Sequence, residues 1–418
     1  MKTKRLCMAA GITAVCSIAI FAAQSAQAQT YEVLYTFVGG TDGANPAASV
    51  IRDTDGNFYG TTYFGGTANL GTVFKLDKSG KETVLHSFIG GTDGASPQAG
   101  VILDAEGNLY GTTTSGGGTG CGGSGCGVVF KVSKTGKEKV LHSFTGSPDG
   151  AVPYGGLILD STGNLYGTTN RGRTGGSCAR FGGGCGVVFK VSNTGKETVL
   201  FSFTDTYSSY PSTGVIHDAQ GHLYGTAHND DSGPGGTVYR LSPGRNGQYK
   251  ETVLYVFTGS TDGSFPSGGL VRDANGNIYG NTAAGGDLDC EMPNGCGVVF
   301  KLSNKDKETV VYSFTGGSDG ANPYGGMIQD AKGNFYGATS EGGGGGCNGS
   351  GCGTVFKLNQ AGHENVLYSF AGANGEPDTP NGVIEDSKGN LYGTTFYGGD
   401  LSCGQNGYGC GVVFKLTP

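Results

Sequence analysis

Residues 310–358 read VVYSFTGGSDGANPYGGMIQDAKGNFYGATSEGGGGGCNGSGCGTVFKL, and this stretch decides the fold. Four short runs in it, VVYSF, GGMIQD, NFYGAT and GTVFKL, are rich in Val, Ile, Met, Phe and Tyr and are bounded by Gly, Asp, Asn or Ser. That composition predicts four β-strands. The link between the second and third runs, from Asp330 to Asn334, is a tight turn with Gly at its fourth position. These two strands are therefore expected to be antiparallel neighbours.

The same four runs recur along the chain. Seven units begin at residues 31, 82, 138, 197, 251, 308 and 364, and together they cover every residue from Tyr31 to Pro418. Repeats of this length with four strands each are typical of β-propellers, in which each blade packs face to face on its neighbours. The sequence predicts an all-β, seven-bladed β-propeller with four antiparallel strands per blade, formed by residues 29–418.

The two ends of the repeat region suggest how the ring closes. The strand VLYTF at residues 33–37 precedes the first complete set of strands, and the chain finishes on GVVFKL at residues 411–416. If GGMIQD-type strands are innermost and VVYSF-type strands outermost, the N-terminal strand completes the last blade. Such pairing closes the ring and removes an open sheet edge.

The first 28 residues are predicted to be a signal peptide. Three basic residues, Lys2, Lys4 and Arg5, precede a mostly apolar stretch at residues 6–23, and Ala26-Gln27-Ala28 forms a small-x-small cleavage site. This is the order of features in a secretory signal. We expect cleavage after Ala28 and a secreted or periplasmic protein with no membrane contact after signal cleavage.

Charge and composition exclude several classes of partner. The chain has 27 Lys and Arg against 34 Asp and Glu, and loss of the three basic signal residues leaves 24 against 34, a net charge of −10. An acidic protein is poorly suited to bind nucleic acid or an anionic membrane. The 84 Gly follow no G-X-Y period, which excludes collagen. We expect no nucleic-acid partner and a monomeric protein.

The cysteines of the mature chain occur in pairs. In five units two Cys lie in the same Gly-rich connection, whereas the first and fourth units have none there. In an exported chain this pattern predicts one disulfide within each connection. Zinc is disfavoured because no His lies beside the thiols. The predicted disulfides are Cys121–Cys126, Cys178–Cys185, Cys290–Cys296, Cys347–Cys352 and Cys403–Cys410.

Residues that recur in every unit are expected to be structural. The Tyr-Gly pair that begins at Tyr59 is predicted to pack between blades, and the Asp that opens each hairpin, such as Asp53, to cap the turn. Residues 53–57, Asp-Thr-Asp-Gly-Asn, look like the start of a calcium loop, but Thr, Gln, Asn or Lys replaces the second Asp in other units. We therefore expect neither a metal site nor a cofactor.

Residues 310–358 resemble the GloVer tandem repeat of secreted bacterial proteins. Their Gly-x-x-x-Asp-x-x-Gly-Asn-x-Tyr core, from Gly326 to Tyr336, is also similar to NHL-like and lyase-like propeller blades. The resemblance covers all seven units. It implies an exported, propeller-like protein and brings no established activity or catalytic residue with it.

Binding residues are expected where the units differ, on the face that holds the two longer connections. Units seven and one, neighbours only after ring closure, each carry an aromatic pair, unit three carries an arginine cluster, and two tyrosines follow a loop proline. Rings beside polar groups suit a polysaccharide or peptide, although the same residues could simply pack on Gly-rich loops. The candidate ligand-binding residues are Tyr63, Phe64, Tyr154, Arg171, Arg173, Arg180, Tyr324, Phe396 and Tyr397.

The residues favour an exported binding or structural scaffold whose ligand is a polysaccharide, a cell-wall component or an extracellular protein. The alternative is a lyase or hydrolase that works at the central channel. His217 lies on the inner strand of unit four at the position that Glu385 occupies in unit seven, and Arg52, Arg272 and Gln329 share that position elsewhere. A ring of these residues near the axis could supply an acid and a base. His217 and Glu385 are the two catalytic candidates.

Overall fold

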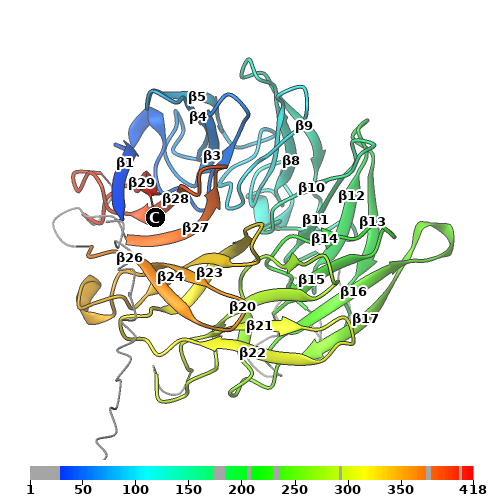
Figure 1. Ribbon diagram of the computed structural model, residues 1–418. Helices are drawn as coiled ribbons and strands as arrows, with labels where there is room; N and C mark the ends of the chain where they lie inside the picture. The colour runs from blue at the N-terminus through cyan, green and yellow to red at the C-terminus, as the bar shows by residue number, and fades with distance from the viewer. Residues whose placement is uncertain are drawn as a thin grey trace, which may run out of the picture.

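The computed structural model of the chain describes residues 29–172, 184–204, 209–228, 235–290, 294–372, 378–403 and 407–417. Within these ranges the chain forms seven separate antiparallel β-sheets, arranged as blades in a ring (Figure 1). The predicted seven-bladed propeller is confirmed. In this part of the chain, no helix is long and apolar enough to cross a membrane. The predicted signal peptide, residues 1–28, lies outside the described residues.

The first six blades are built from consecutive strands, and the order within each blade runs from the innermost strand outward. Blade 1 is β2 (Ile51–Arg52), β3 (Phe58–Thr62), β4 (Thr72–Leu76) and β5 (Glu82–Ser87); blade 2 is β6 (Ile102–Leu103), β7 (Leu109–Thr113), β8 (Val128–Val132) and β9 (Glu138–Ser143). Blade 3 is β10 (Ile158–Leu159), β11 (Leu165–Thr169), β12 (Val187–Val191) and β13 (Glu197–Ser202); blade 4 is β14 (Ile216–His217), β15 (Leu223–Ala227), β16 (Thr237–Pro243) and β17 (Tyr249–Val256). Blade 5 is β19 (Val271–Arg272), β20 (Ile278–Ala284), β21 (Val298–Leu302) and β22 (Glu308–Ser313), with β18 (Ser264–Pro266) also paired to β20; blade 6 is β23 (Ala321–Gln329), β24 (Phe335–Glu341), β25 (Thr354–Leu358) and β26 (Glu364–Ser369).

Blade 7 joins the two ends of the chain. It consists of β27 (Asp378–Glu385), β28 (Leu391–Tyr397), β29 (Val412–Thr417) and, as its outermost strand, β1 (Thr30–Thr36). The β1–β29 ladder is antiparallel and runs from the Thr30–Thr417 pair to the Thr36–Val412 pair. Figure 1 shows the blue β1 beside the red β29. The predicted closure of the ring by the N-terminal strand is confirmed.

The innermost strands are shorter than the sequence pattern suggests. In blades 1 to 5 each has only two residues next to the hairpin, although the apolar run is longer. The glycines that precede these strands lie where neighbouring blades meet at the axis: a Cβ on Gly155 of blade 3 would lie 2.5 Å from the backbone nitrogen of Gly214 in blade 4. At the axis, close contact between blades replaces regular pairing within a blade.

The core lies between the blades. The aromatic residue of each GVVFKL-type strand, Tyr239 in blade 4 and Phe in the others, is fully buried. It meets the Phe that follows the outer strand of the preceding blade, as Phe74 meets Phe37 edge to face at 5.1 Å. A Cβ on Gly60 would lie 2.7 Å from Phe74, so the Gly of the Tyr-Gly pair makes room for the ring. Edge-to-face aromatic contacts add to the area burial that holds the blades together.

The repeated Asp caps its turn as the sequence predicts, and the repeated Tyr, which packs against the next blade as predicted, also bonds to that Asp. Asp53 Oδ1 accepts hydrogen bonds from the backbone of Asp55 and Asn57, and Oδ2 accepts from Asn57 Nδ2 at 2.7 Å and from Tyr59 Oη at 2.9 Å. Burial alone would raise the pKa of Asp53, but these hydrogen bonds outweigh burial and lower it. Burial and the contact with Asp53 raise the pKa of Tyr59 to about 12. Both oxygens of this carboxylate are therefore occupied by protein donors.

A second repeated contact, at the outer rim, was not predicted. Tyr35 Oη donates to Asp42 Oδ2 at 2.9 Å, and His86 Nε2 takes the place of that hydroxyl beside Asp93 at 3.0 Å in the next blade. Glu82 of blade 1 has a buried Oε1 without a hydrogen-bond partner, and burial together with the charge of Asp42 raises its pKa to about 7. The sequence carries a signal for this contact. Each unit that contains an Asp-Gly-x-x-Pro sequence has a Tyr or a His seven residues before the Asp.

Neighbouring blades are also joined by a backbone hydrogen bond, which we call the latch. It lies on the Cys-loop face, the face on which the long connections meet. The residue before each loop proline has a φ between 51° and 57°, and its N–H bonds to a carbonyl of the preceding blade. At the ring closure, Asn45 N donates to Cys410 O at 2.8 Å, and a Cβ on Gly411 would lie 2.8 Å from Pro46 Cδ. The seven pairs are Asn45–Cys410, Ser96–Leu70, Val152–Cys126, Tyr210–Cys185, Phe265–Gly235, Asn322–Cys296 and Thr379–Cys352.

Candidate functional site

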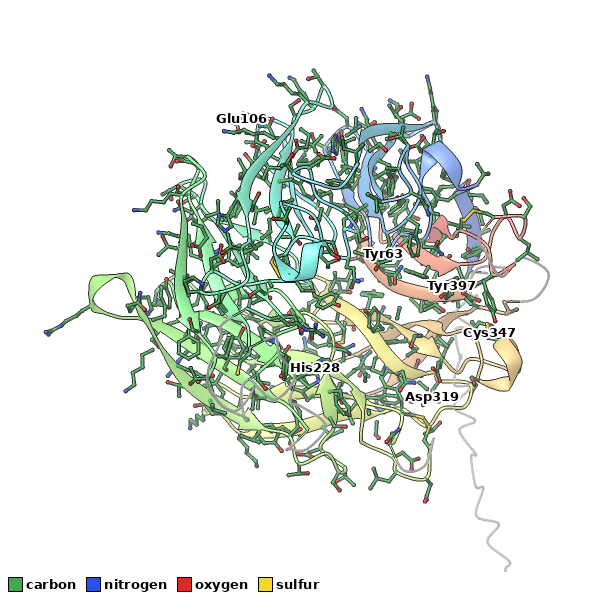
Figure 2. All side chains as sticks on the ribbon, turned by 180° about the vertical axis from the view of Figure 1, so that it is seen from behind. Tyr63, Glu106, His228, Asp319, Cys347 and Tyr397 are labelled. Atoms are coloured by element: carbon green, nitrogen blue, oxygen red, sulfur yellow. A yellow bond between two sulfur atoms is a disulfide. The ribbon has the colours of Figure 1, made fainter. Side chains whose placement is uncertain are left out.

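Closure of the ring creates a cleft between blades 7 and 1 on the Cys-loop face. Its volume is about 580 Å³, and Phe64, Phe396, Tyr397 and Tyr408 contribute its aromatic lining. Three of these four residues were candidates from the sequence, and the structure brings them together. Figure 2 shows the labelled Tyr63 and Tyr397 on the adjoining blue and red-orange blades. We call this pocket the seam cleft.

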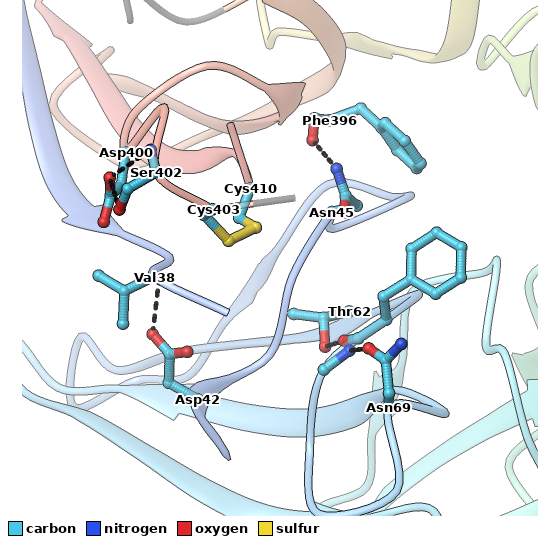
Figure 3. Close-up of a disulfide and its surroundings, with 12 residues drawn as sticks. Val38, Asp42, Asn45, Thr62, Asn69, Phe396, Asp400, Ser402, Cys403 and Cys410 are labelled. Carbon is cyan, nitrogen blue, oxygen red and sulfur yellow. Dashed lines mark hydrogen bonds between the residues drawn. A yellow bond between two sulfur atoms is a disulfide. The ribbon is translucent and has the colours of Figure 1, made fainter. Parts of the chain in front are cut away.

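Backbone contacts fix the floor of the seam cleft. Ala44 and Phe64 exchange backbone hydrogen bonds of 2.9 and 3.0 Å, which places the Phe64 ring beside the latch. Asn45 Nδ2 donates to Phe396 O at 2.8 Å, so an amide of blade 1 holds the end of β28 in blade 7 (Figure 3). Asn69 Oδ1 accepts from Gly65 N at 2.8 Å and orders the loop after β3.

The Cys403–Cys410 disulfide forms one wall of the cleft (Figure 3). A Cβ on Gly39 would lie 2.7 Å from Cys403 Sγ, so only Gly lets the loop after β1 pack against the bridge. In blade 1, which has no cysteine pair, Leu70 takes the same place against Gly90.

The structure contains four of the predicted disulfides. Cys185 is also disulfide-bonded, and its predicted partner Cys178 lies outside the described residues. The four bridges are Cys121–Cys126, Cys290–Cys296, Cys347–Cys352 and Cys403–Cys410.

The aromatic rings of the cleft form a broad, partly exposed surface. Tyr397 and Tyr408 lie 5.6 Å apart between ring centroids, and Phe396 meets Tyr397 edge to face at 4.8 Å. Phe64 is 40% exposed and Tyr408 53% exposed, values high enough for a ligand to reach the rings. Tyr63 does not line the cleft but supports Phe64 through an edge-to-face contact at 4.5 Å.

The electrostatics of the cleft are simple. None of the described lining residues carries a charge, and the nearby charges in Figure 3 are both carboxylates, those of Asp42 and Asp400. Asp42 Oδ2 accepts from Val38 N at 3.0 Å, and Val38 lines the cleft. Asp400 Oδ1 accepts from Ser402 Oγ and N, and these hydrogen bonds lower its pKa.

Tyr154 and Tyr324 lie elsewhere, in the central channel. The channel has a volume of about 380 Å³, and all seven blades contribute to its wall. Tyr324 is 49% exposed, yet burial, together with the nearby Tyr154, raises its pKa, as expected for a ring surrounded by a narrow channel. Among the described residues of the wall there is no Asp, Glu, His, Lys or Arg.

The arginine cluster of unit three is only partly visible. Arg171 is exposed, and its backbone bridges to Ala151 through hydrogen bonds of 2.7 and 3.0 Å. Arg173 and Arg180 lie outside the described residues, so the predicted anion site stays a prediction.

The two catalytic candidates do not line the channel. His217 is exposed, with Nδ1 3.3 Å from the neighbouring Asp218 O, and burial and the charge of Asp330 raise the pKa of Glu385. No hydrogen bond or ion pair joins these two within the described part of the chain. Arg52, at the same position of blade 1, stacks on Tyr392 of blade 7 at 5.8 Å.

The physical reason is the orientation of the innermost strands. Side chains project from the two faces of a sheet, toward neighbouring blades, whereas only the edge of the innermost strand faces the axis. The ring of residues expected near the axis therefore differs from the structure, in which Gly, Ala and Ser from before the strands line the channel together with apolar and amide side chains.

Sequence reasoning missed three parts of the seam cleft. Tyr408 sits inside the last cysteine pair, and Asn45 and Asn69 lie in loops of unit one. Only Tyr408 had a usable signal, because it is a bulky aromatic residue in a connection otherwise made of small and polar residues. The two Asn resemble ordinary turn residues until the ring is closed.

Comparisons with known proteins identify the family and find distant likenesses among solved structures. Solved structures similar to the chain include a gluconolactonase from Xanthomonas campestris, at 12% identity, with 93% of this chain and 89% of that chain covered and a TM-score of 0.43. They also include the PQQ-bound aldose sugar dehydrogenase of Streptomyces coelicolor, at 12% identity, with 93% and 98% covered and a TM-score of 0.46. At this distance the likeness concerns the fold alone.

The comparison with curated proteins finds no match. The model of the Gloeobacter/Verrucomicrobia repeat matches residues 17–181, 175–292 and 289–418, which together span most of the sequence. These matches run through all seven blades described above. The chain therefore belongs to the Gloeobacter/Verrucomicrobia repeat family.

Proposed function

We propose that the protein is an extracytoplasmic binding module that holds a polysaccharide chain in the seam cleft. The observation that carries this proposal is the convergence of Phe64, Phe396, Tyr397 and Tyr408 around one cleft at the ring closure. The corresponding residues of other blades are small or polar, for example Thr114 and Ser115 in blade 2. The aromatic lining is thus a property of one junction and not of the repeat.

The chemistry of the cleft suits sugar rings. Aromatic faces stack on the apolar faces of sugars, while hydroxyl and amide groups orient the ligand. In the part of the chain that the structure describes, the hydroxyls of Tyr397 and Tyr408 make no hydrogen bond to protein and are free for a ligand. The volume of about 580 Å³ lies within the usual range for small-ligand sites.

The disulfides support an extracytoplasmic location. Short cysteine pairs close loops in four described blades, and such bridges persist in oxidising compartments. The signal peptide predicted at residues 1–28 would direct the chain there. Export is part of the proposal.

An enzyme at the central channel finds less support. General acid–base catalysis needs a titratable group within hydrogen-bond reach of the substrate. Tyr154 and Tyr324 are the only such groups among the described residues of the channel wall. His217 and Glu385 lie outside that wall, so a lyase or hydrolase would need a different site.

The test is a binding screen of the oxidised mature protein on an array of polysaccharides and peptidoglycan, with thermal shift as a second readout. We expect at least one polysaccharide to bind, and Tyr397→Ala and Phe64→Ala each to weaken that binding by about tenfold, which equals about 1.4 kcal/mol. Ser340→Ala in blade 6, at the position of Phe396, is the matched control and should bind like the parent protein. Binding that survives both aromatic substitutions, or no polysaccharide binding by the folded protein, would refute the proposal.

A further inference from the structure

We infer that the seam cleft selects uncharged glycan chains and rejects chains of uronic acids or other polyanions. This inference rests on the proposed function and adds the class of ligand. It starts from the side chains around the cleft: the described lining residues include no Lys, Arg or His, and the carboxylates of Asp42 and Asp400 accept hydrogen bonds from two of the lining residues. An anionic ligand would find no cation to pair with there.

The first carboxylate belongs to Asp42. Its Oδ2 accepts from Tyr35 Oη at 2.9 Å and from Val38 N at 3.0 Å, whereas its Oδ1 is buried and has no hydrogen-bond partner. Val38 itself lines the cleft, and Figure 3 shows it beside this carboxylate. One oxygen of this carboxylate thus accepts no hydrogen bond, and the other bonds to a residue of the cleft wall, so its charge lies next to that wall.

The second carboxylate belongs to Asp400, in the loop that precedes the disulfide. Asp400 Oδ1 binds Ser402 N at 2.9 Å, and Ser402 lines the cleft. No ion pair to Asp42 or Asp400 forms among the described residues. Both charges therefore lie within reach of a ligand in the cleft, since the Debye length is about 8 Å at physiological ionic strength.

The positions of the Lys and Arg side chains on the molecule support the same inference. Apart from Arg171, the Lys and Arg residues in the described ranges lie at the end of the blades opposite the Cys loops, in or near a tight hairpin or, for Lys415, near the end of β29. Lys131 on β8, for example, stacks on Tyr110 at 5.1 Å and lies 3.9 Å from Asp104 of the same blade. Among the described residues, the face that holds the cleft is thus acidic, whereas the opposite face contains every Lys and Arg except Arg171.

The energetic consequence favours neutral sugars. A carboxylate that leaves water without gaining a cation loses hydration free energy and is repelled by the two aspartates. A neutral sugar ring gives up no ionic hydration, and its hydroxyls can bond to Tyr397, Tyr408 and Asn69. Charge thus acts in this cleft mainly as a means of rejecting ligands.

The experiment compares matched polymers. Each neutral polysaccharide that binds in the array is tested beside its derivative carboxylated at C6, with the oxidised mature protein at low ionic strength. We expect the carboxylated chain to bind about tenfold more weakly, and the difference to shrink at about 1 M salt, where the Debye length is about 3 Å. Equal or tighter binding of the carboxylated chain would overturn the inference.

Two variants test whether Asp400 causes the weaker binding of the carboxylated polymer. Asp400→Asn keeps the turn acceptor and should narrow the difference between the two polymers. Asp287→Asn is the matched control, because Asp287 occupies the same position before the disulfide of blade 5 and accepts from Asp289 N at 3.1 Å. It should leave the difference unchanged, and an equal effect of both variants would overturn the inference. If no neutral polymer binds at all, the proposed function itself fails.

Discussion

The junction between blades 7 and 1 and the junction between blades 5 and 6 share one backbone and differ in side chains. The latch bond is 2.8 Å at Asn45 N to Cys410 O and 2.9 Å at Asn322 N to Cys296 O. Where the first junction presents Phe396, Tyr397 and Phe64, the second presents Ala283, Ala284 and Glu341. The repeated sequence thus specifies the backbone of the propeller, whereas a few positions that differ from unit to unit specify a site.

The largest expected effect tests whether the two junctions are equally strong. Phe37→Ala and Phe314→Ala each remove a fully buried ring from equivalent interfaces, against Phe74 and Phe356. Each should lower the free energy of unfolding by about 3–5 kcal/mol, measured by chemical denaturation. A much larger loss for Phe37→Ala alone would show that the noncovalent closure is the weak point of the ring.

Removal of one disulfide or the other distinguishes an effect on stability from an effect on binding. Replacing both Cys by Ser in Cys403–Cys410 or in Cys290–Cys296 should cost about 2 kcal/mol in either case, because each bridge closes a short loop. Only the first replacement removes a wall of the seam cleft, so only it should weaken ligand binding. For both variants, thermal unfolding measures the loss of stability and titration with the ligand measures the loss of affinity. A loss of affinity in the Cys290–Cys296 variant would contradict the assignment of the cleft.

The buried glutamates predict how stability depends on pH at both junctions. The pKa of Glu82 at the ring closure and that of Glu364 in blade 6, beside Asp319 at the junction of blades 5 and 6, are each raised to about 7, because of burial and of the neighbouring aspartate. The folded state therefore binds these protons more tightly than the unfolded state. Their contribution to stability is present below pH 4.5, the ordinary pKa of a Glu side chain, and is lost as the pH rises toward 7.

The hairpin aspartates give the opposite dependence of stability on pH. The pKa of Asp53 is lowered, so its contribution is present above the ordinary Asp pKa of 3.8 and is lost as the pH falls below it. The melting temperature should be highest near pH 4–5, roughly between the two ordinary pKa values, and fall toward pH 8. Glu82→Gln and Glu364→Gln should each raise it at pH 8 by about 2 °C and flatten the alkaline side. A profile that rises steadily to pH 8 would contradict this account.

The smallest expected effect concerns a residue next to the site. Tyr63 touches the Phe64 ring edge to face but does not line the cleft. Tyr63→Ala should weaken polysaccharide binding by about threefold, within the usual contribution of an aromatic contact. Thr114→Ala, at the same position of blade 2, should leave the affinity unchanged in the same titration. A loss as large as that of Phe64→Ala would mean that Tyr63 itself contacts the ligand.

The fold could be predicted from the sequence because each blade repeats the same local rules. The Asp-to-Asn turn, the Tyr-Gly pair and the GVVFKL strand recur, so sheet order and ring closure follow from one unit. The cysteine pairs were equally clear, since both members lie in one connection. The contact between units was missed: the latch bond of Asn45 to Cys410 joins the first and last units, and no single unit shows it. The Tyr35–Asp42 bond lies within one unit, seven residues apart, and its signal was overlooked.

The site was predictable only in part, for a related reason. Phe64, Phe396 and Tyr397 stand out because other units lack aromatics at their positions. The ring of His217, Glu385 and their equivalents was expected near the axis because the inner strand lies there, but its side chains project from the sheet faces toward the neighbouring blades.

The central claim is that the ligand occupies the seam cleft, and a crystal structure of the protein soaked with an oligosaccharide from the best-binding polymer tests it most directly. The account predicts a sugar ring stacked on Tyr397 or Phe64, with its hydroxyls near Tyr408 and Asn69. A sugar bound in the central channel beside Tyr154 and Tyr324, or at the junction of blades 5 and 6, would contradict it.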